Sequence, residues 1–308
     1  MFPNRAAVES VGDAIELAPI KGRSLWADAR ARFFRNRAAV VALIALGLVG
    51  AFALFGGIFA QYEPDFVNFS LIGSNAYLGV PSTETGHYFG TDSNGRDLFA
   101  RTVQGTGISL MVGIVGALVA VIVGTLYGAT AGYYGGRVDG LMMRIVDVLM
   151  SIPFMFVLIL MLVIFGRSIF MLFLGIGLIS WLDMARIARG QTLTIKNKEF
   201  VEVAVAIGVH PAKIILRHIV PNLLGIVIVY ATLLVPNMII FESFISFLGL
   251  GVQEPATSLG ALINEGSRTM QFGYYWQIGF PLFFFVVTIF AFFFVGDGLR
   301  DALDPKDR

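Results

Sequence analysis

The sequence contains no cysteine and only three histidines, so disulfide bonds and thiolate metal sites are excluded. The histidines, His87, His210 and His218, do not have the HExxH spacing of a zinc-binding helix. No glycine is followed directly by a lysine, which excludes a phosphate-binding loop of the form GxxxxGK[ST]. A GxSxG nucleophile motif is also missing. The sequence therefore predicts a chain with no metal site and no cofactor of its own, which is not an enzyme.

Charged residues are scarce as well, at 14% of the chain, whereas hydrophobic residues make up 56% and the mean hydropathy is +0.78. Soluble domains carry more charge and fewer apolar residues. The apolar residues here form runs long enough to cross a bilayer. We predict an all-α polytopic membrane protein with six transmembrane helices, over residues 38–60, 106–131, 141–165, 169–185, 223–248 and 278–295.

Lysine and arginine are distributed unevenly about these spans. Only four, Arg96, Arg101, Arg167 and Arg268, fall on one side. All the others lie on the opposite side, in residues 1–37, 137–144, 186–217 and 300–308. Because positively charged loops are retained in the cytoplasm, both termini are predicted to be cytoplasmic.

This topology divides the chain into four parts. Residues 1–37 are predicted to form a cytoplasmic N-terminal tail, and residues 38–103 the first transmembrane helix and an extracytoplasmic loop. Residues 104–298 form the transmembrane core, which contains a cytoplasmic loop over residues 186–222, and residues 299–308 form a cytoplasmic C-terminal tail.

Small residues and prolines give information on how the spans pack. Small residues recur every four positions in the second span, at Gly116, Ala120, Gly124, Gly128 and Gly132. On a helix they form one stripe, which would let a second helix approach closely in the membrane. The alternative is a chance spacing, since glycine is frequent in transmembrane helices. Pro153, Pro236 and Pro281 lie inside spans and predict kinks there.

Ionisable residues inside a membrane are costly, so they are usually paired or functional. Arg144 and Asp147 are spaced i, i+3, which predicts a mutual ion pair at the membrane interface. Asp183 and Arg186 repeat this spacing. Glu242 has no basic residue nearby in sequence, so its partner must come from another helix, another chain or water. The sequence leaves open whether Glu242 is structural or lies in a transport path.

The segment 198–222 is the one long polar interruption between hydrophobic spans in the second half of the chain. Its first part predicts a short helix with Val201, Ala204, Val205 and Gly208 on one face. Gly208 then breaks the pattern, and Pro211 suits the first turn of a second helix that begins near His210. Pro221 is predicted to close this second helix.

The second helix of this segment is also amphipathic. Its apolar side carries Ile214, Ile215 and Ile219, and its charged side carries Lys213 and Arg217. Such a segment could lie flat on lipid or dock into a groove of a partner protein.

Five segments spread over most of the chain resemble motifs of one known family, and they occur in the same order as in that family. Glu202, Val203, Ala204, Gly208 and Pro221 are similar to a cytoplasmic motif that begins EAA, with valine in place of the middle alanine. Residues 89–101, FGTDSNGRDLFAR, resemble GTDxxGRDxxSR, with alanine in place of serine. The other three segments are MRIVDVLMSIPF (143–154), ESFISFLGLGVQEP (242–255) and GDGLRDALDP (296–305). The family is that of permease subunits of binding-protein-dependent ABC importers, specifically the second, C-type subunit of dipeptide and oligopeptide systems.

The resemblance implies a type I ABC importer permease, with a core of five helices plus one N-terminal helix, in the bacterial cytoplasmic (inner) membrane. The expected partners are a second, non-identical permease, two ABC ATPase subunits that bind ATP and Mg, an extracytoplasmic substrate-binding protein and the lipid bilayer, but no nucleic acid. The cargo is expected to be a peptide or a similar small solute.

The resemblance also implies roles for particular residues. An ATPase-coupling role falls on Glu199, Glu202, Ala204, Gly208, His210, Pro211, Lys213, Arg217 and Pro221. The extracytoplasmic motif comprises Gly90, Thr91, Asp92, Gly95, Arg96 and Asp97. The motif is rich in turn-forming residues, and Arg96 can pair with an aspartate, so we expect a local turn network or a contact with the binding protein.

Two other functions are possible from the residues alone. A secondary transporter driven by an ion gradient would need intramembrane carboxylates and inverted repeats, and only Glu242 is a candidate. A membrane-embedded hydrolase would need nucleophile and base motifs that this sequence does not contain.

Overall fold

The computed structural model describes residues 25–72 and 79–303, and within these all the named secondary-structure elements are helical. The prediction of an all-helical membrane protein is confirmed. Residues 1–24 and 304–308 of the predicted tails lie outside the described residues. Within the predicted N-terminal tail, residues Leu25–Arg35 form a helix, α2, and α3 (Arg37–Phe55) follows it directly. Asn36 caps α3 by accepting a hydrogen bond from the backbone N–H of Ala39 at 3.2 Å.

Among the described residues, five helices or helical runs are long and apolar enough to cross a membrane: Arg37–Ile58, Leu98–Tyr134 (α4), Ile169–Ile195 (α7), Pro211–Phe247 and Tyr275–Leu303 (α12). Most are longer than the predicted spans, because their polar end turns continue the helix beyond the apolar run. A sixth span exists if the bent pair α5 (Gly136–Ser151) and α6 (Phe154–Phe165) is counted as one.

The third predicted span, 141–165, is therefore broken and not merely kinked. α5 and α6 meet at an angle of 76°. Ile152, the residue before Pro153, has an extended backbone, with φ −85° and ψ 125°. A proline clashes with a helical residue before it, which explains the break at this position. Pro236 and Pro281, by contrast, lie inside helices that continue through them.

The remaining elements connect these helices at the two ends of the bundle. One end carries two short helical turns, Gly56–Ile58 and Phe69–Leu71, together with α11 (Leu259–Thr269) and the turn Met270–Phe272. The other end carries α8 (Glu199–Ala206), α9 (Pro211–Ile214) and the π-helical turn Ile215–Ile219, which leads into α10 (Val220–Phe247).

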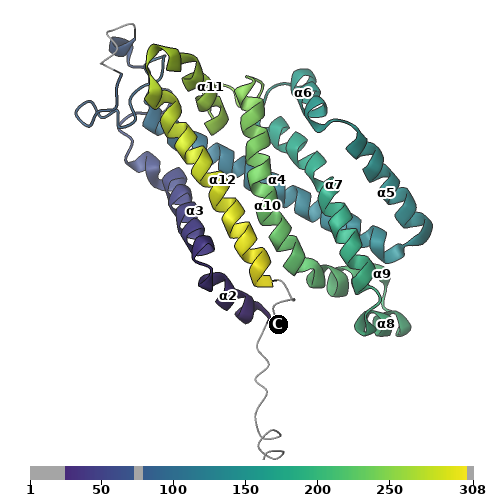
Figure 1. The fold of residues 1–308 in the computed structure, drawn as a ribbon. Coiled ribbons are helices and arrows are strands. Elements are labelled where there is room, and N and C mark those ends of the chain that lie inside the picture. Colours follow the sequence, from purple (N-terminus) through teal and green to yellow (C-terminus); the bar gives the residue numbers. More distant parts are fainter. Residues whose placement is uncertain (1–24, 73–78, 304–308) are drawn as a thin grey trace, which may run out of the picture.

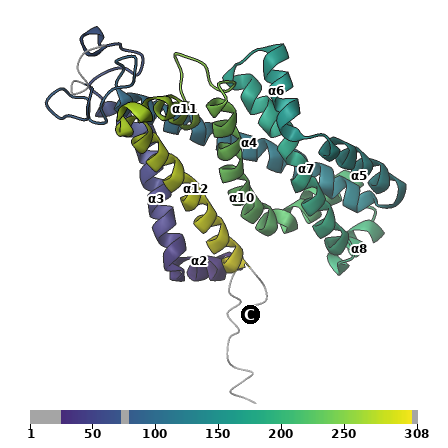
Figure 2. The ribbon, with the colours of Figure 1, turned by 45° about the horizontal axis from the view of Figure 1, so that its top comes forward.

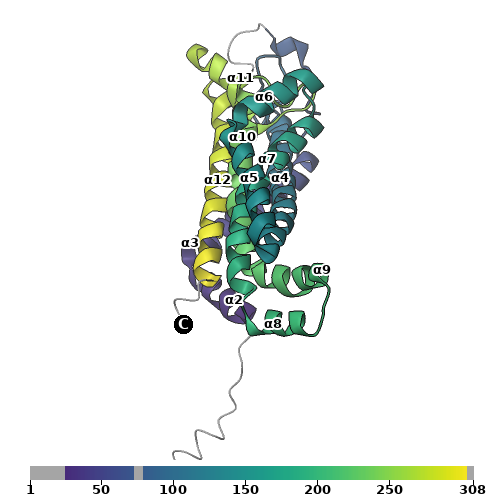
Figure 3. The ribbon, with the colours of Figure 1, turned by 90° about the vertical axis from the view of Figure 1, so that its right-hand side faces the viewer.

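The long helices lie side by side, with α10 between α12 and α7 and with α4 crossing behind them (Figure 1). α3 packs along α12, and α5 lies at the far edge beyond α7, as a tilted view also shows (Figure 2). Seen from the side, α8 and α9 project beyond the ends of the long helices, at the end opposite α11 (Figure 3).

Candidate functional site

The unit formed by α8 and α9 is held on the bundle through one apolar face. Val201 and Ala204 of α8 are buried in a cluster with Ile214, Ile215 and Ile219, and this cluster also includes Met184 and Ala188 of α7. Val205 and Gly208, which were predicted on the same face, are exposed instead. The helix is only two turns long, so its buried face is narrow. The same cluster contains Leu223 and Val227 of α10, so it connects α8 with both α7 and α10.

A second, adjacent face of α8 is exposed and apolar. Val203 is 58% exposed and Ile207 is 73% exposed, and Phe200 lies beside them, also exposed. Glu199 and Glu202 occupy the first turn of α8, where negative charge stabilises a helix N-terminus. An exposed apolar face with acidic neighbours is typical of a surface that a partner covers.

Gly208 follows the last turn of α8 and has a left-handed backbone conformation. Its φ is +79°, and the backbone N–H of Val209 donates to the carbonyl of Ala204 at 3.0 Å while that of Gly208 donates to Val205 at 3.0 Å. These two bonds form a Schellman motif, which requires a residue with positive φ at this position. A Cβ placed on Gly208 would meet nothing within 4 Å, so the requirement for glycine is conformational and not steric.

The second helix of the segment begins as the sequence predicts. The side chain of His210 caps it by accepting a hydrogen bond from the backbone N–H of Ala212 at 3.3 Å, and Pro211 is its first residue. Lys213 and Arg217 are exposed. The predicted end at Pro221 is wrong, because the chain passes through a π-helical turn, Ile215–Ile219, directly into α10. The wider π turn lies immediately before the proline, where it accommodates the ring without ending the helix.

Two ion pairs join α5 to α7 near this unit. Arg189 donates to both oxygens of Asp139, at 2.5 and 2.6 Å, and Arg186 donates to Asp147 at 2.5 Å. The pairs predicted within one helix, Arg144 with Asp147 and Asp183 with Arg186, are wrong, since Arg186 pairs across helices. Partners 39 and 50 residues apart have no local spacing by which a sequence could reveal them.

The small-residue stripe of α4 lies against α7 and α10. A Cβ on Gly124 would lie 2.6 Å from the carbonyl oxygen of Trp181, and one on Gly128 would clash with that of Ala185. A Cβ on Gly132 would lie 2.8 Å from Cβ of Thr192 and 2.9 Å from the carbonyl oxygen of Arg189. At Gly116 the nearest neighbours, Ile176 and Met238, are 3.6 Å away. Ala120 is fully buried. Backbone therefore meets backbone along the half of the stripe nearer the α8 end.

The motif at residues 90–97, which was predicted to be extracytoplasmic, forms a buried network of turns and charges. Asp92 accepts hydrogen bonds from the backbone N–H groups of Asn94 and Arg96, at 2.8 and 2.9 Å, and from the Arg96 side chain at 2.7 Å. Gly90 and Gly95 have φ of +76° and +74°, which explains glycine at both positions. Burial lowers the pKa of Arg96, but the charge and hydrogen bonds of Asp92 and Glu254 outweigh it and raise this pKa above its ordinary value.

This network also reaches distant parts of the chain. Arg96 donates to Glu254 at 2.8 Å, and Arg101 donates to Asp92 and to both oxygens of Glu265 in α11, the latter at 2.6 and 3.1 Å. The carbonyl of Thr91 accepts hydrogen bonds from Trp276 and Gln277 at the start of α12, at 3.3 and 2.9 Å. Arg101, Glu254 and Glu265 were not predicted as site residues, although Arg101 closes the quoted motif.

Asp97 caps α4 and pairs with a histidine that the sequence did not single out. It accepts from the backbone N–H of Ala100 at 2.8 Å and contacts Nδ1 of His87 at 2.8 Å. Burial raises the pKa of Asp97 above its ordinary value, although these two hydrogen bonds act to lower it. The ring of His87 stacks on Tyr62 with centroids 4.3 Å apart, which ties the loop after α3 to the motif.

Glu242 is fully buried in α10, and its partners are hydroxyl groups. It accepts hydrogen bonds from Ser109 of α4 at 2.9 Å, and from Ser243 and Ser246 at 3.1 and 2.6 Å. Ser109 in turn accepts from the backbone N–H of Leu259 at the start of α11, at 3.2 Å. The sequence left open whether the partner of Glu242 comes from another helix, another chain or water, and in the structure Ser109 of α4 is a partner from another helix. Through Ser109, the carboxylate of Glu242 in α10 is linked to both α4 and the start of α11.

The sequence of this bundle matches a known family over more than half of its length. Residues 124–308 match the family described as binding-protein-dependent transport system inner membrane component. The chain belongs to this family. Residues 24–76, which include α2 and α3, match a second description, the N-terminal TM domain of oligopeptide transport permease C. The family resemblance is thereby confirmed, and the protein is a multi-pass inner membrane transport component.

Curated relatives match this transport component over almost their whole length. It is 54% identical over 305 residues to the oligopeptide transport system permease protein OppC of Escherichia coli K12, covering 99% of this chain and 98% of that protein. It is 52% identical to OppC of Haemophilus influenzae, covering 99% and 96%. It is 42% identical to the dipeptide transport system permease protein DppC of Bacillus subtilis, covering 91% and 86%.

A solved structure has the same fold. An inward-facing structure of the MetNI methionine ABC transporter aligns with a TM-score of 0.53 and 18% identity, covering 66% of this chain and 95% of that chain. This likeness supports the expected permease fold. The family match gives no support to an ion-gradient-driven secondary transporter, and the orientation of the termini stays a prediction.

Proposed function

We propose that this inner membrane component is a permease subunit of an ATP-driven importer of peptides, and that the unit formed by α8 and α9 docks on an ATPase subunit. The names of the relatives, oligopeptide and dipeptide permeases, support peptides as the cargo. The complete assembly would contain a second, non-identical permease, two ATPases and an extracytoplasmic binding protein. Because this chain has no P-loop motif, ATP and Mg belong to the ATPases.

The observation that supports docking best is the exposed apolar face of α8. It projects from the end of the bundle that the distribution of lysine and arginine predicts to be cytoplasmic (Figure 3). An amphipathic helix in a groove of a partner is a common mode of recognition. In this proposal Phe200, Val203 and Ile207 enter the groove, and Glu199 and Glu202 meet its polar rim. The alternative is that the segment lies on anionic lipid through Lys213 and Arg217, which are exposed. It is less well supported, because the exposed apolar residues of α8 lie beside two acidic side chains, Glu199 and Glu202.

The contacts around α8 explain how docking could move the spans. Val201 and Ala204 carry a displacement of α8 into the cluster that contains residues of α7 and α10. α7 is in turn packed against α4 along the small-residue stripe and joined to α5 by the pairs Arg189–Asp139 and Arg186–Asp147. Closure of the ATPases would thus move these helices together as a rigid body, and alternating access would follow. The network of residues 90–101 lies at the other end, where it shapes the surface offered to the binding protein.

Substitution of Gly208 tests the docking proposal. We expect Gly208→Val to assemble but to lose most peptide-dependent ATP hydrolysis, because an L-residue in the left-handed region costs about 1–2 kcal/mol. That strain shifts the population of the docking conformation by about tenfold. Gly208→Asn is the matched control, since asparagine tolerates positive φ, and it should retain most activity. The measurement is ATP hydrolysis and peptide uptake by the reconstituted complex.

Two results would count against this proposal. One is full coupling in Gly208→Val, which would show that the geometry of the α8 end is unimportant. The other is an equal loss in Gly208→Asn, which would show that the loss comes from adding any side chain and not from the backbone conformation.

A further inference from the structure

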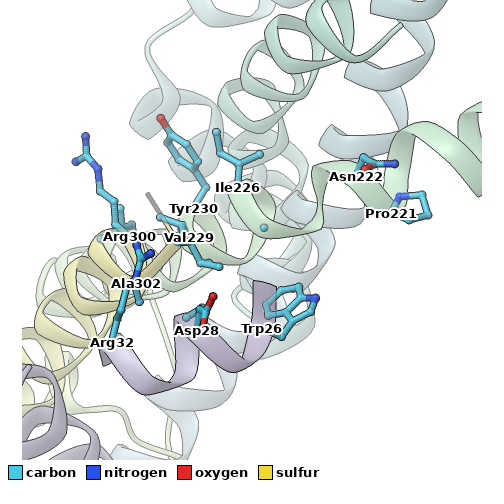
Figure 4. Close-up of a pocket in the computed structure, with 14 residues that line it drawn as sticks. Trp26, Asp28, Arg32, Pro221, Asn222, Ile226, Val229, Tyr230, Arg300 and Ala302 are labelled. Atoms are coloured by element: carbon cyan, nitrogen blue, oxygen red, sulfur yellow. The ribbon is translucent and has the colours of Figure 1, made fainter. Parts of the chain in front are cut away.

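A cavity of about 520 Å³ lies between α2, α10 and α12 (Figure 4). α2 lies at the same end of the bundle as α8 (Figure 1). The cavity is separate from the exposed face of α8, although Pro221 and Asn222, at the start of α10, form one part of its wall. A cavity of this size can hold a small ligand or part of a larger one.

The cavity combines positive charge with an apolar wall. Arg32 of α2 and Arg300 of α12 lie on the same side of it (Figure 4). Among the described residues that line it, Asp28 is the one acidic residue. Ile226, Val229 and Leu233 line it along α10, at positions i, i+3 and i+7. This spacing makes an apolar strip that runs along the spanning helix for about two turns. The ligand that fits is an anion with an attached hydrocarbon chain.

The helix that forms the other wall has the features of a membrane-interface helix. α2 exposes Trp26 and Phe34 together with Arg30 and Arg35, and it directly precedes the first span, α3. Amphipathic helices with aromatic and basic residues lie at the level of lipid headgroups. The cavity therefore opens the bundle where phospholipid phosphates are abundant.

We propose that the cavity binds one anionic phospholipid, with its phosphate at Arg32 and Arg300 and an acyl chain along Ile226, Val229 and Leu233. Basic pockets between transmembrane helices are known to bind anionic headgroups. Because the cavity joins the start of α10 to α2 and α12, a bound lipid would hold these three elements together. This inference does not depend on peptides as the cargo or on docking of α8.

The test uses the intact transport complex in nanodiscs of phosphatidylethanolamine with phosphatidylglycerol, and native mass spectrometry counts the retained phosphatidylglycerol. We expect the double substitution Arg32→Gln, Arg300→Gln to weaken the affinity for phosphatidylglycerol by about thirtyfold, since each of the two basic residues contributes about 1 kcal/mol. The matched control, Arg30→Gln with Arg35→Gln, removes the same charge from exposed positions of α2 and should retain the lipid. Equal retention in the wild type and in the Arg32, Arg300 variant would overturn the proposal.

A second variant guards against loss by misfolding. A Cβ on Gly225 would meet nothing within 4 Å, and Gly225 lines the cavity, so Gly225→Leu should fill the cavity while all charges remain. We expect it to lose the lipid while the complex stays assembled. If glycerol 3-phosphate displaced the lipid at equal concentration, the site would be one for phosphate and not for lipid. If a transported peptide displaced it, the cavity would belong to the peptide path, and the proposal would also fail.

Discussion

Replacing Arg101 by methionine is expected to destabilise the protein by about 3 kcal/mol, because it removes one partner from a buried group of charges. Arg101 is 1% exposed and donates to Asp92 and Glu265. Methionine would fill much of its volume but ends short of the guanidinium, so Arg96 would be left as the cation that contacts these carboxylates. This loss of stability is at the lower end of the range for a broken buried ion pair, because Glu265 is partly exposed. The readout is the midpoint of thermal unfolding in detergent.

The matched control for this substitution is Arg268→Met. Arg268 is an exposed residue in the last turn of α11, the same helix that carries Glu265, and its loss should change stability by less than about 0.5 kcal/mol. If both variants unfolded at the same temperature, the charge network would not be what holds α11 to the start of α4.

Replacing Gly128 by alanine is expected to disrupt the packing of α4 on α7. The added Cβ would clash with the carbonyl oxygen of Ala185 and lie 2.8 Å from the backbone nitrogen of Arg189. Side chains can change rotamer to make room, but backbone atoms cannot, so the two helices must separate. We expect this separation to lower the stability of the protein by about 2–3 kcal/mol. The yield of assembled complex and its unfolding midpoint should both fall.

The same substitution at Gly116 provides the control, on the same stripe of the same helix. There the nearest atoms to the added Cβ are 3.6 Å away and belong to side chains. Alanine is also the better helix former by about 0.5–1 kcal/mol, so Gly116→Ala should be neutral or slightly stabilising. A similar loss at both positions would mean that the stripe is not a seam between backbones.

The features that could be predicted from the sequence depend on local chemistry. Six hydrophobic runs, the break at Gly208 and the helix start at His210 and Pro211 follow from apolar run length, from the freedom of glycine and from the fixed φ of proline. The network around residues 90–97 was anticipated in part, because turn-forming residues and an aspartate–arginine pair lie close together in sequence.

The features that could not be predicted depend on which helices become neighbours. Arg189 finds Asp139 and Arg101 finds Glu265 only after the bundle has formed. The continuation of the helix through Pro221 was missed for another reason. A proline normally ends a helix, and here the π turn before it removes the conflict, which no residue pattern in the segment indicates.

The central claim, that α8 docks on an ATPase, can be tested most directly by cross-linking from a single position. Because the chain has no cysteine, Val203→Cys can be labelled at one site with a photoreactive maleimide in the assembled complex. Phe272→Cys, which is exposed at the opposite end of the bundle, is the control. We expect illumination to join this chain to an ATPase subunit from position 203 and not from position 272, with a yield that changes on addition of ATP. Failure to form an ATPase adduct at position 203, or an equal yield at both positions, would contradict the claim.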